Sequence, residues 1–161
     1  MANKNKLTSE IFSDEHWMKE ALVEAKLAFE LDEVPVGAVV VYQNHIIGRG
    51  HNLKEKHQHV TAHAELIAIE QASQHLQSWR LKGCTLFVTL EPCMMCTGAL
   101  IQSRIDRIVF GVKDEKSGAI ESQLQLRKIP RLQHQPLTQS DVLSSDSQAL
   151  LKTYFQKKRH E

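Results

Sequence analysis

The sequence is poor in cysteine and contains no long apolar run. Three cysteines in 161 residues are an odd number, which argues against the disulfide framework of small secreted domains. No stretch of about 20 apolar residues occurs, so no membrane-spanning segment is expected. The first ten residues are polar, include Lys4 and Lys6, and lack the apolar core of a secretory signal. We therefore expect a cytoplasmic protein without a membrane partner.

An excess of charge of one sign is also missing. The formal net charge is +1 and the pI is about 7.8, so bulk electrostatics gives no support for nucleic-acid binding. The charge is unevenly distributed, because residues 1–103 carry 9 Lys/Arg and 12 Asp/Glu whereas residues 104–161 carry 11 and 7. Solvated helix faces often produce such asymmetry. The length predicts one domain over residues 1–161, with a flexible N-terminus over 1–12.

The strongest chemical signal comes from two short motifs, Thr61-Ala62-His63-Ala64-Glu65 and Glu91-Pro92-Cys93-Met94-Met95-Cys96. Imidazole and thiolate are ligands that zinc prefers, and a catalytic zinc site has three protein ligands and an open position. His63, Cys93 and Cys96 provide such a set. The two motifs together predict one catalytic zinc site.

The second motif is predicted to begin a helix. Pro92 is a residue typical of the first helical position, which places Cys93 and Cys96 in or near the first turn, three residues apart on one face. Both sulfurs can then reach one ion. The dipole at a helix N-terminus also lowers the pKa of a thiol, which favours thiolate ligands.

Glu65 is predicted to move protons rather than to bind the metal. It follows His63 by two residues, which on a regular helix is a rotation of about 200°, so the two side chains would not share a face. A carboxylate beside the attacking water can take its proton and return it to a substrate nitrogen. The pattern H-x-E followed by P-C-x-x-C is the signature of zinc nucleobase deaminases.

Each motif also has a simpler interpretation. A Cys-x-x-Cys pair can be a redox pair or half of a structural zinc site. A fourth ligand could close the site, and the candidates are Cys84 or one of the nearby histidines His45, His51, His57, His59 and His75. The glutamate two residues after His63 favours a catalytic zinc site over a redox pair and over a structural zinc site.

Hydrophobic periodicity predicts a three-layer α/β/α sandwich, with a central mixed sheet of about five strands and helices on both faces. Alternating strands and helices imply parallel pairing with right-handed crossovers, and sites in such sheets form beyond the carboxyl ends of the strands. The segment 53–60 is expected to be a polar loop, 111–118 a charged loop, and 121–131 helical or irregular. The predicted helices cover 13–31, 62–76, 92–102 and 144–161, and the strands 36–42, 46–50, 85–89, 107–110 and 137–142.

The motifs resemble those of the bacterial tRNA-specific adenosine deaminases, within the zinc-dependent cytidine deaminase superfamily. Two further segments agree in order and spacing, Val34-Pro35-Val36-Gly37-Ala38 and Val109-Phe110-Gly111. The resemblance implies hydrolytic conversion of adenosine to inosine at the wobble position of a tRNA anticodon loop. It also implies one Zn²⁺ per subunit, held by His63, Cys93 and Cys96, and a homodimer that completes the substrate site across its interface.

The resemblance further implies which residues contact the substrate. An amide can bind a sugar or base edge, although Asn52 could equally cap its own turn. Bases stack on aromatic side chains while cations hold phosphates, but the two aromatic residues of the last helix could instead be core. The family usually has two phenylalanines where this chain has Tyr154-Phe155. The implied contacts are Asn52, Ala64, Asp114, Lys116, Tyr154, Phe155 and Arg159.

Two alternatives to this function remain open from the sequence. The zinc motif belongs to the whole superfamily, so a deaminase of free cytosine, guanine, cytidine or a nucleotide would carry it too. A non-catalytic RNA-binding module with structural zinc is the alternative of a different class. Activity on RNA that depends on residues 150–161 would favour the tRNA enzyme.

Overall fold

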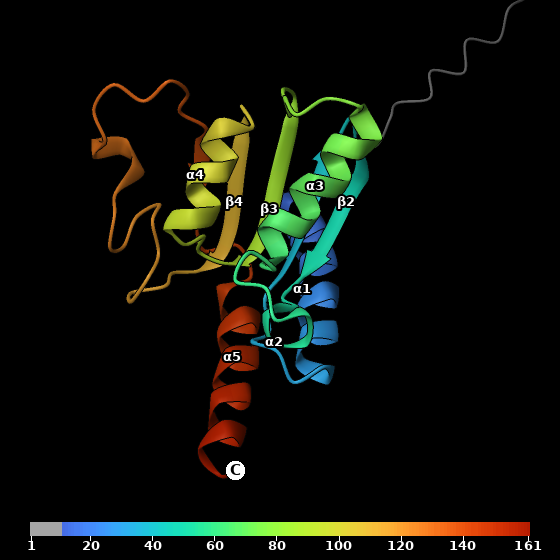
Figure 1. The fold of residues 1–161 in the computed structure, drawn as a ribbon, viewed down its shortest axis with the longest axis vertical. Coiled ribbons are helices and arrows are strands. Elements are labelled where there is room, and N and C mark those ends of the chain that lie inside the picture. Colours follow the sequence, from blue (N-terminus) through green and yellow to red (C-terminus); the bar gives the residue numbers. More distant parts are fainter. Residues whose placement is uncertain (1–10) are drawn as a thin grey trace, which may run out of the picture.

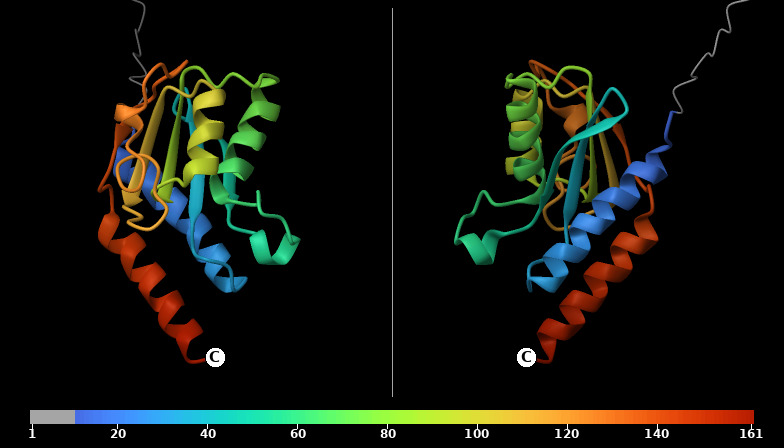
Figure 2. Two further views of the ribbon diagram at one scale, coloured as in Figure 1. Left: turned by 60° about the vertical axis from the view of Figure 1, so that its left-hand side comes forward. Right: turned by 90° about the vertical axis from the view of Figure 1, so that its right-hand side faces the viewer.

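The computed structural model describes residues 11–161, which form three layers around a five-stranded sheet (Figure 1). Helices α3 and α4 cover one face of the sheet, and α1 and α5 lie on the other (Figure 2). The predicted α/β/α sandwich is thereby confirmed. In chain order the elements are α1 Asp14–Glu30, β1 Gly37–Tyr42, β2 His45–His51, α2 Lys54–His57, α3 Ala64–Leu76, β3 Cys84–Leu90, α4 Met94–Gln102, β4 Arg107–Val112, the 3₁₀ helix η1 Leu126–Lys128, β5 Leu137–Gln139 and α5 Ser144–Arg159.

The strand order is β2-β1-β3-β4-β5, and the sheet is mixed. Strands β3, β4 and β5 are parallel, as expected, whereas β1 pairs antiparallel with both β2 and β3. Strands β2 and β3, which α3 connects, therefore run in the same direction with β1 between them. The carboxyl ends of β2, β3 and β4 therefore lie at the same edge of the sheet. The first predicted motif comes after β2 and the second directly after β3, so both lie near this edge.

Strand β1 is apolar along its whole length because both of its faces are buried. Val39 and Val41 pack with Trp17 on the α1 side, while Ala38 and Val40 belong to the core under α3. Burial of one valine side chain stabilises the folded state by roughly 1.5–3 kcal/mol. Two cores thus hold the sheet between its helix layers.

A close approach between β2 and α3 fixes the position of the first motif. A Cβ atom at Gly50 would lie 2.2 Å from the carbonyl oxygen of Ala64, which no side chain can tolerate. Glycine at this strand position therefore lets the first turn of α3 pack directly on the backbone of β2. Glu65 lies in that turn, and His63 directly precedes it.

Three local expectations were wrong. The predicted loop 53–60 contains the short helix α2, whose backbone N–H groups at Glu55 and Lys56 are bound by the distant carboxylate of Glu33. The fifth strand ends at Gln139 rather than at residue 142, because Asp141 adopts a left-handed conformation with φ of 64°. No serine caps α5, since its N-cap is Leu143, without a side-chain bond. Residues 121–131 are irregular apart from η1.

The expectation of a flexible segment over residues 1–12 concerns positions that, apart from Ile11 and Phe12, lie outside the described residues, as does the polar segment with Lys4 and Lys6. Between residues 11 and 161, no helix has both the length and the apolar character that crossing a membrane requires.

Candidate active site

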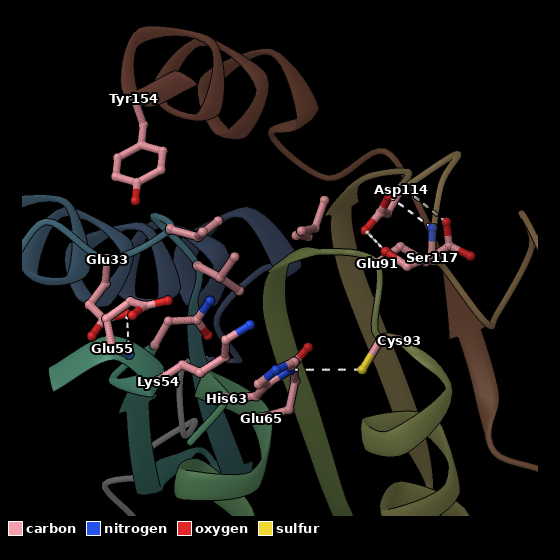
Figure 3. Close-up of a pocket in the computed structure, with 14 residues that line it drawn as sticks. Glu33, Lys54, Glu55, His63, Glu65, Glu91, Cys93, Asp114, Ser117 and Tyr154 are labelled. Carbon is pink, nitrogen blue, oxygen red and sulfur yellow. Dashed lines mark hydrogen bonds between the residues drawn. The ribbon is translucent and has the colours of Figure 1, made fainter. Parts of the chain in front are cut away.

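His63, Cys93 and Cys96 meet where α3 and α4 begin. The Nδ1 atom of His63 lies 3.8 Å from the Sγ of Cys93 and 3.6 Å from the Sγ of Cys96, and the three ligand atoms lie within 4.8 Å of one another. A tetrahedral zinc with bonds of about 2.3 Å to sulfur and about 2.1 Å to nitrogen separates such atoms by about 3.6–3.8 Å. The three side chains therefore fit one zinc ion, and Figure 3 shows two of them, His63 and Cys93.

Both helix starts differ in detail from the expectation. His63 is the N-cap of α3 and Cys93 is the N-cap of α4, each with an extended backbone, so α4 begins at Met94 rather than at Pro92. Cys96 lies in the first turn of α4 and is fully buried. The extended N-cap positions turn the ligands of both motifs toward one point, and both helix dipoles favour thiolates there.

Glu65 shares a cavity with His63 although it follows it by only two residues. The predicted rotation of about 200° applies to a regular helix, but His63 stands outside the helical turns, so the two side chains converge. The Glu65 side chain is 4% exposed, and its Oε2 atom has no hydrogen-bond partner among the described residues. Burial raises the pKa of Glu65 to about 7. A carboxyl group in this range can accept and release a proton near neutral pH.

The two thiols of the site differ in acidity. The pKa of Cys93 is lowered to about 4, mainly by a hydrogen bond from Cys96 and to a smaller extent by one with His63. The pKa of Cys96 is raised by that same hydrogen bond to Cys93 and by burial. Two neighbouring thiolates repel each other, and Cys96 is also buried, so both thiols ionise together readily only beside a cation. The donor set thus matches a thiolate-binding divalent metal.

Above the ligand set lies a cavity of about 230 Å³. Two walls face each other across it: the loop after β2 with α2 on one side, and the loop after β4 on the other (Figure 3). The structure brings together six of the predicted site residues in its lining, namely Asn52, His63, Glu65, Cys93, Asp114 and Tyr154.

Asn52 and Ala64 are linked to each other. The side-chain Oδ1 of Asn52 accepts a hydrogen bond of 2.9 Å from the backbone N–H of Ala64. Ala64 itself is fully buried. A substrate contact at either residue remains a prediction, and at Asn52 the remaining polar atom is the amide nitrogen.

The other predicted RNA contacts line a neighbouring hollow of about 820 Å³, which shares Asp114 with the cavity. Lys116, Phe155 and Arg159 lie there, and the Phe155 ring is 46% exposed. Tyr154 is 6% exposed, and its hydroxyl donates to the carbonyl oxygen of Asp32 at 3.3 Å. Of the two adjacent aromatic residues, only Phe155 therefore presents its ring for stacking.

The candidates for a fourth metal ligand do not reach the site. Cys84 begins β3 and Cys93 follows its end, so the seven-residue strand separates them by roughly 20 Å. His57 and His59 line a different hollow beside α3. In the described part of the chain, the metal-ligand group consists of the three predicted residues, which leaves one coordination position open.

Sequence reasoning missed several residues that line the cavity. Two of them are buried glutamates near prolines of the recognised motifs: Glu33 precedes Pro35 by two residues, and Glu91 directly precedes Pro92. A buried acidic residue needs partners. The glutamate that directly follows the apolar strand β3, Glu91, could therefore have indicated a buried polar contact in the sequence. The remaining missed lining residues include Lys54, Glu55 and Ser117.

The known proteins to which this chain is similar are deaminases. The sequence profile of the MafB19-like deaminases matches residues 12–159. The tRNA-specific adenosine deaminase of Bacillus subtilis (strain 168) is 46% identical over 146 residues, which cover 91% of each chain. The enzyme of the same name from Aquifex aeolicus (strain VF5) is 43% identical and covers 91% of this chain and 96% of its own.

Solved structures agree with these sequences. A structure from a study of A-to-I editing by tRNA:A34 deaminases at the wobble position superposes with a TM-score of 0.82 at 43% identity, covering 84% of this chain and 99% of that one. Guanine deaminase from Nitrosomonas europaea superposes with a TM-score of 0.76, covering 89% and 85%. Its identity of 22% indicates a shared fold only.

Proposed function

This chain belongs to the MafB19-like deaminases and, among them, to the tRNA-specific adenosine deaminase family, and we propose that it converts adenosine to inosine at the wobble position of a tRNA anticodon. The reaction is hydrolytic: water adds at C6 of adenine and ammonia leaves. The observation that carries the proposal is the buried Glu65 carboxylate, whose Oε2 atom has no hydrogen-bond partner among the described residues, in the cavity that His63 and Cys93 of the three-residue metal-ligand group also line.

His63, Cys93 and Cys96 would hold one Zn²⁺ per chain, which their separations fit. When bound, zinc supplies the Lewis acidity that makes water a nucleophile near neutral pH. The three ligands come from two helix N-termini, so the fold orients them without a fourth protein ligand.

Glu65 would carry the proton between the attacking water and the substrate. Its Oε2 atom is buried and has no protein partner among the described residues, so it is available to a group that enters the cavity. The carboxyl group can pass one proton of the attacking water to the ring nitrogen, where it stays in the product. It can then pass the second proton, from the new hydroxyl group at C6, to the departing amine, which leaves as ammonia. Asn52 would orient the nucleoside through its amide nitrogen, since its oxygen already binds Ala64.

The substrate base must leave its stack to reach these groups. The cavity opens beside the hollow that contains Lys116, Phe155 and Arg159. An exposed aromatic ring can stack a neighbouring base while the cations hold phosphates. An unpaired anticodon loop provides such splayed bases, which supports tRNA over a free nucleoside as the substrate.

We also propose a homodimer in the cytoplasm. Trp79 and Met94 are 56% and 67% exposed, and a hollow on the outer side of α3 and α4 is lined mainly by apolar groups that include Leu66, Ile69 and Ala99. Exposed apolar surface of this kind favours association. Light scattering of the purified protein would measure the mass, and a monomer at micromolar concentration would contradict the dimer.

The decisive experiment measures inosine in a synthetic anticodon stem-loop with adenosine at the wobble position. Free adenosine, cytidine, cytosine and guanine are assayed beside it, with the zinc-loaded protein and the E65A variant as the inactive control. Conversion of the stem-loop alone supports the proposal. Conversion of only a free base or nucleoside would keep the deaminase chemistry and overturn the tRNA substrate.

A further inference from the structure

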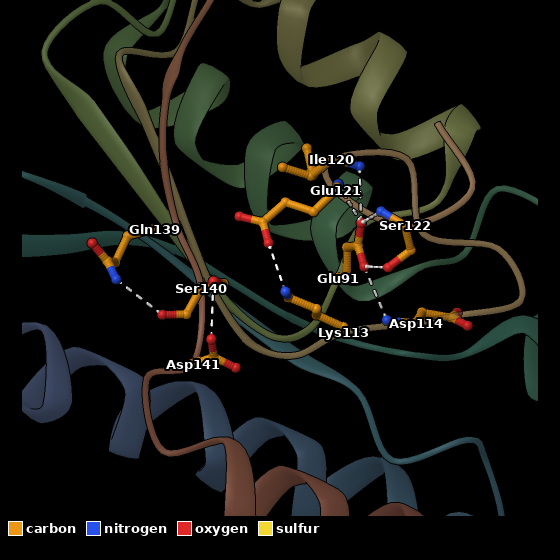
Figure 4. A network of polar contacts seen from close by, with 9 residues as sticks. All are labelled: Glu91, Lys113, Asp114, Ile120, Glu121, Ser122, Gln139, Ser140 and Asp141. Carbon is orange, nitrogen blue, oxygen red and sulfur yellow. Dashed lines mark hydrogen bonds and ion pairs between the residues drawn. The ribbon is translucent and has the colours of Figure 1, made fainter. Parts of the chain in front are cut away.

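The Glu91 carboxylate accepts five hydrogen bonds, all from one loop of the protein. Glu91 directly follows β3 and is 2% exposed. One carboxylate oxygen accepts from the backbone N–H groups of Ile120, Glu121 and Ser122 at 3.0, 2.7 and 3.0 Å. The other accepts from the N–H of Asp114 at 3.0 Å and from the Ser122 hydroxyl (Figure 4). All five bonds reach residues 114–122, hereafter the β4 loop.

The β4 loop is also attached to the metal-ligand segment. Gly118 forms an isolated antiparallel bridge with Cys93, and the N–H of Ala119 donates to the carbonyl oxygen of Pro92 at 2.8 Å. The loop is thus held at two adjoining places, by the Glu91 carboxylate and by the backbone that follows it.

The same loop forms one wall of the cavity. Asp114 and Ser117 line it, and the Asp114 carboxylate closes the turn by accepting from the N–H and the hydroxyl of Ser117. The opposite wall carries Asn52 and Lys54. The position of the β4 loop therefore sets the width of the cavity above His63.

Gly118 shows how tightly the carboxylate fits under the loop. A Cβ atom at this position would lie 2.3 Å from the carboxyl carbon of Glu91 and 2.6 Å from the carbonyl oxygen of Asp114. Such contacts force the loop or the carboxylate to move. Glycine here is a requirement of the packing between the two.

We propose that Glu91 is a positioning residue for the deamination: its carboxylate holds the β4 loop against Cys93 so that Asp114 and Ser117 form the substrate-facing wall. The proposal rests on the proposed function, because the wall matters only if a base enters this cavity. Glu91 acts through the loop and transfers no proton.

The test is the Glu91→Gln variant, which keeps the side-chain volume but points an NH₂ donor at backbone donors. Loss of hydrogen bonds to a charged acceptor at the wall should raise KM for the stem-loop by about tenfold or more. We expect kcat to stay within about threefold, because Glu65 and the three metal ligands are unchanged. Zinc content should remain that of the wild type.

The matched control is Leu81→Ala. Leu81 is fully buried just before β3, at the opposite end of the strand from Glu91. A residue that only stabilises the fold lowers the fraction of active protein, which reduces apparent kcat and leaves KM unchanged. L81A should therefore show a lower apparent kcat and an unchanged KM, with a Tm lowered as much as in E91Q. If E91Q also shows a lower kcat and an unchanged KM, the proposal is overturned.

Two further variants address the same contact if E91Q does not fold. Ser122→Ala removes one of the five bonds and should raise KM less than E91Q. Gly118→Ala places a Cβ against the carboxylate and should raise KM in the same direction. Unchanged KM in both variants would overturn the proposal.

Amide hydrogen exchange separates this proposal from the function on which it rests. E91Q should exchange faster at residues 114 and 120–122 while the core strands β1 and β3 stay protected. If the wild type leaves the stem-loop unmodified, the proposed function fails. Exchange then decides only whether the Glu91 carboxylate holds the β4 loop in place, and unchanged protection of that loop would contradict this.

Discussion

The side-chain oxygen of Asn52 accepts a hydrogen bond from the backbone N–H of Ala64, twelve residues further along the chain. Ala64 is the first residue of α3, and the residue before it is His63, a proposed metal ligand. The bond therefore ties the loop after β2 to the helix start that carries the ligand. The oxygen of Asn52 thus serves the fold, and under the proposed function its amide nitrogen would contact the substrate.

These two roles predict different behaviour for two variants. Asn52→Ala leaves the buried N–H of Ala64 without its acceptor, which should cost about 1–3 kcal/mol of unfolding free energy. Asn52→Asp keeps the acceptor, so its unfolding free energy should stay near that of the wild type, while activity on the stem-loop falls with the lost donor. Urea unfolding and inosine formation measure the two effects. Full activity in N52D would contradict the substrate contact.

Glu65→Ala should abolish turnover without loss of zinc. General acid–base catalysis contributes about 10²–10⁴-fold in rate. The carboxylate has a hydrogen bond with Cys96, but the three side chains that would hold the zinc are unchanged in the variant. Inosine formation and metal analysis of the same sample check this, with Glu65→Gln as a variant of equal volume. Substantial activity in either variant would remove Glu65 from the proposed mechanism.

Two fully buried cysteines allow a matched test of the metal site. Cys96→Ala should lower zinc affinity by more than about 100-fold, since even changes behind a metal ligand cost about 10–100-fold. Cys84→Ala removes a thiol of the same burial at the far end of β3 and should keep its zinc. The measurement is zinc per chain after dialysis against a weak chelator. Zinc loss in C84A alone would refute the ligand assignment.

The last helix predicts opposite results for its two neighbouring aromatic residues. Phe155→Ala should weaken stem-loop binding by about 1–3 kcal/mol through lost stacking, with little change in Tm, because the ring is half-exposed. Tyr154→Ala should lower Tm, because its buried ring packs edge-on against Phe29. Fluorescence anisotropy and thermal unfolding separate the two. Unchanged RNA binding in F155A would contradict the stacking role.

Asp32 connects the end of α1 to α5 and should titrate abnormally. The hydrogen bond from Lys158 lowers the pKa of its carboxyl below 3.8, against a weaker opposing effect of burial. A lowered pKa means that the stabilisation is present above the pKa of the unfolded chain and is lost as the pH falls through that of the folded protein.

The carboxyl chemical shift of Asp32 measures this pKa directly. Lys158→Gln should raise it toward the ordinary value, and added salt should do the same because the pair is exposed. Lys157→Gln is the control, since Lys157 approaches Asp32 only to 3.9 Å and should change the pKa less. Equal effects of both variants would contradict the assignment to Lys158.

Prediction from the sequence succeeded where the cause lies within a few residues. Ser13 caps α1 by accepting from the N–H of His16, as its sequence pattern suggested. The hairpin of β1 and β2 follows from two apolar runs around a short turn. The group of His63, Cys93 and Cys96, which could hold a metal ion, was recognisable because the two cysteines are three residues apart and imidazole completes a zinc-type set.

Prediction failed where the cause lies far along the chain. Helix α2 was missed because Glu33, more than twenty residues earlier, binds its N–H groups. The orientation of Glu65 relative to His63 was missed because the N-cap geometry of His63 replaces the regular helical rotation. Burial of Tyr154 beside exposed Phe155 depends on how α5 packs on the end of α1.

The sequence by itself determined the candidate metal-ligand types, the carboxylate proposed to carry the proton and most of the helices and strands, because these depend on residue chemistry and short-range periodicity. Only the tertiary structure decided what surrounds the ligands. Glu91 reaches partners 23 to 31 residues away, and no local pattern encodes such a distance. Buried polar groups must find partners wherever the packed chain provides them, so the walls of the cavity emerge only when the sheet and its helices are assembled.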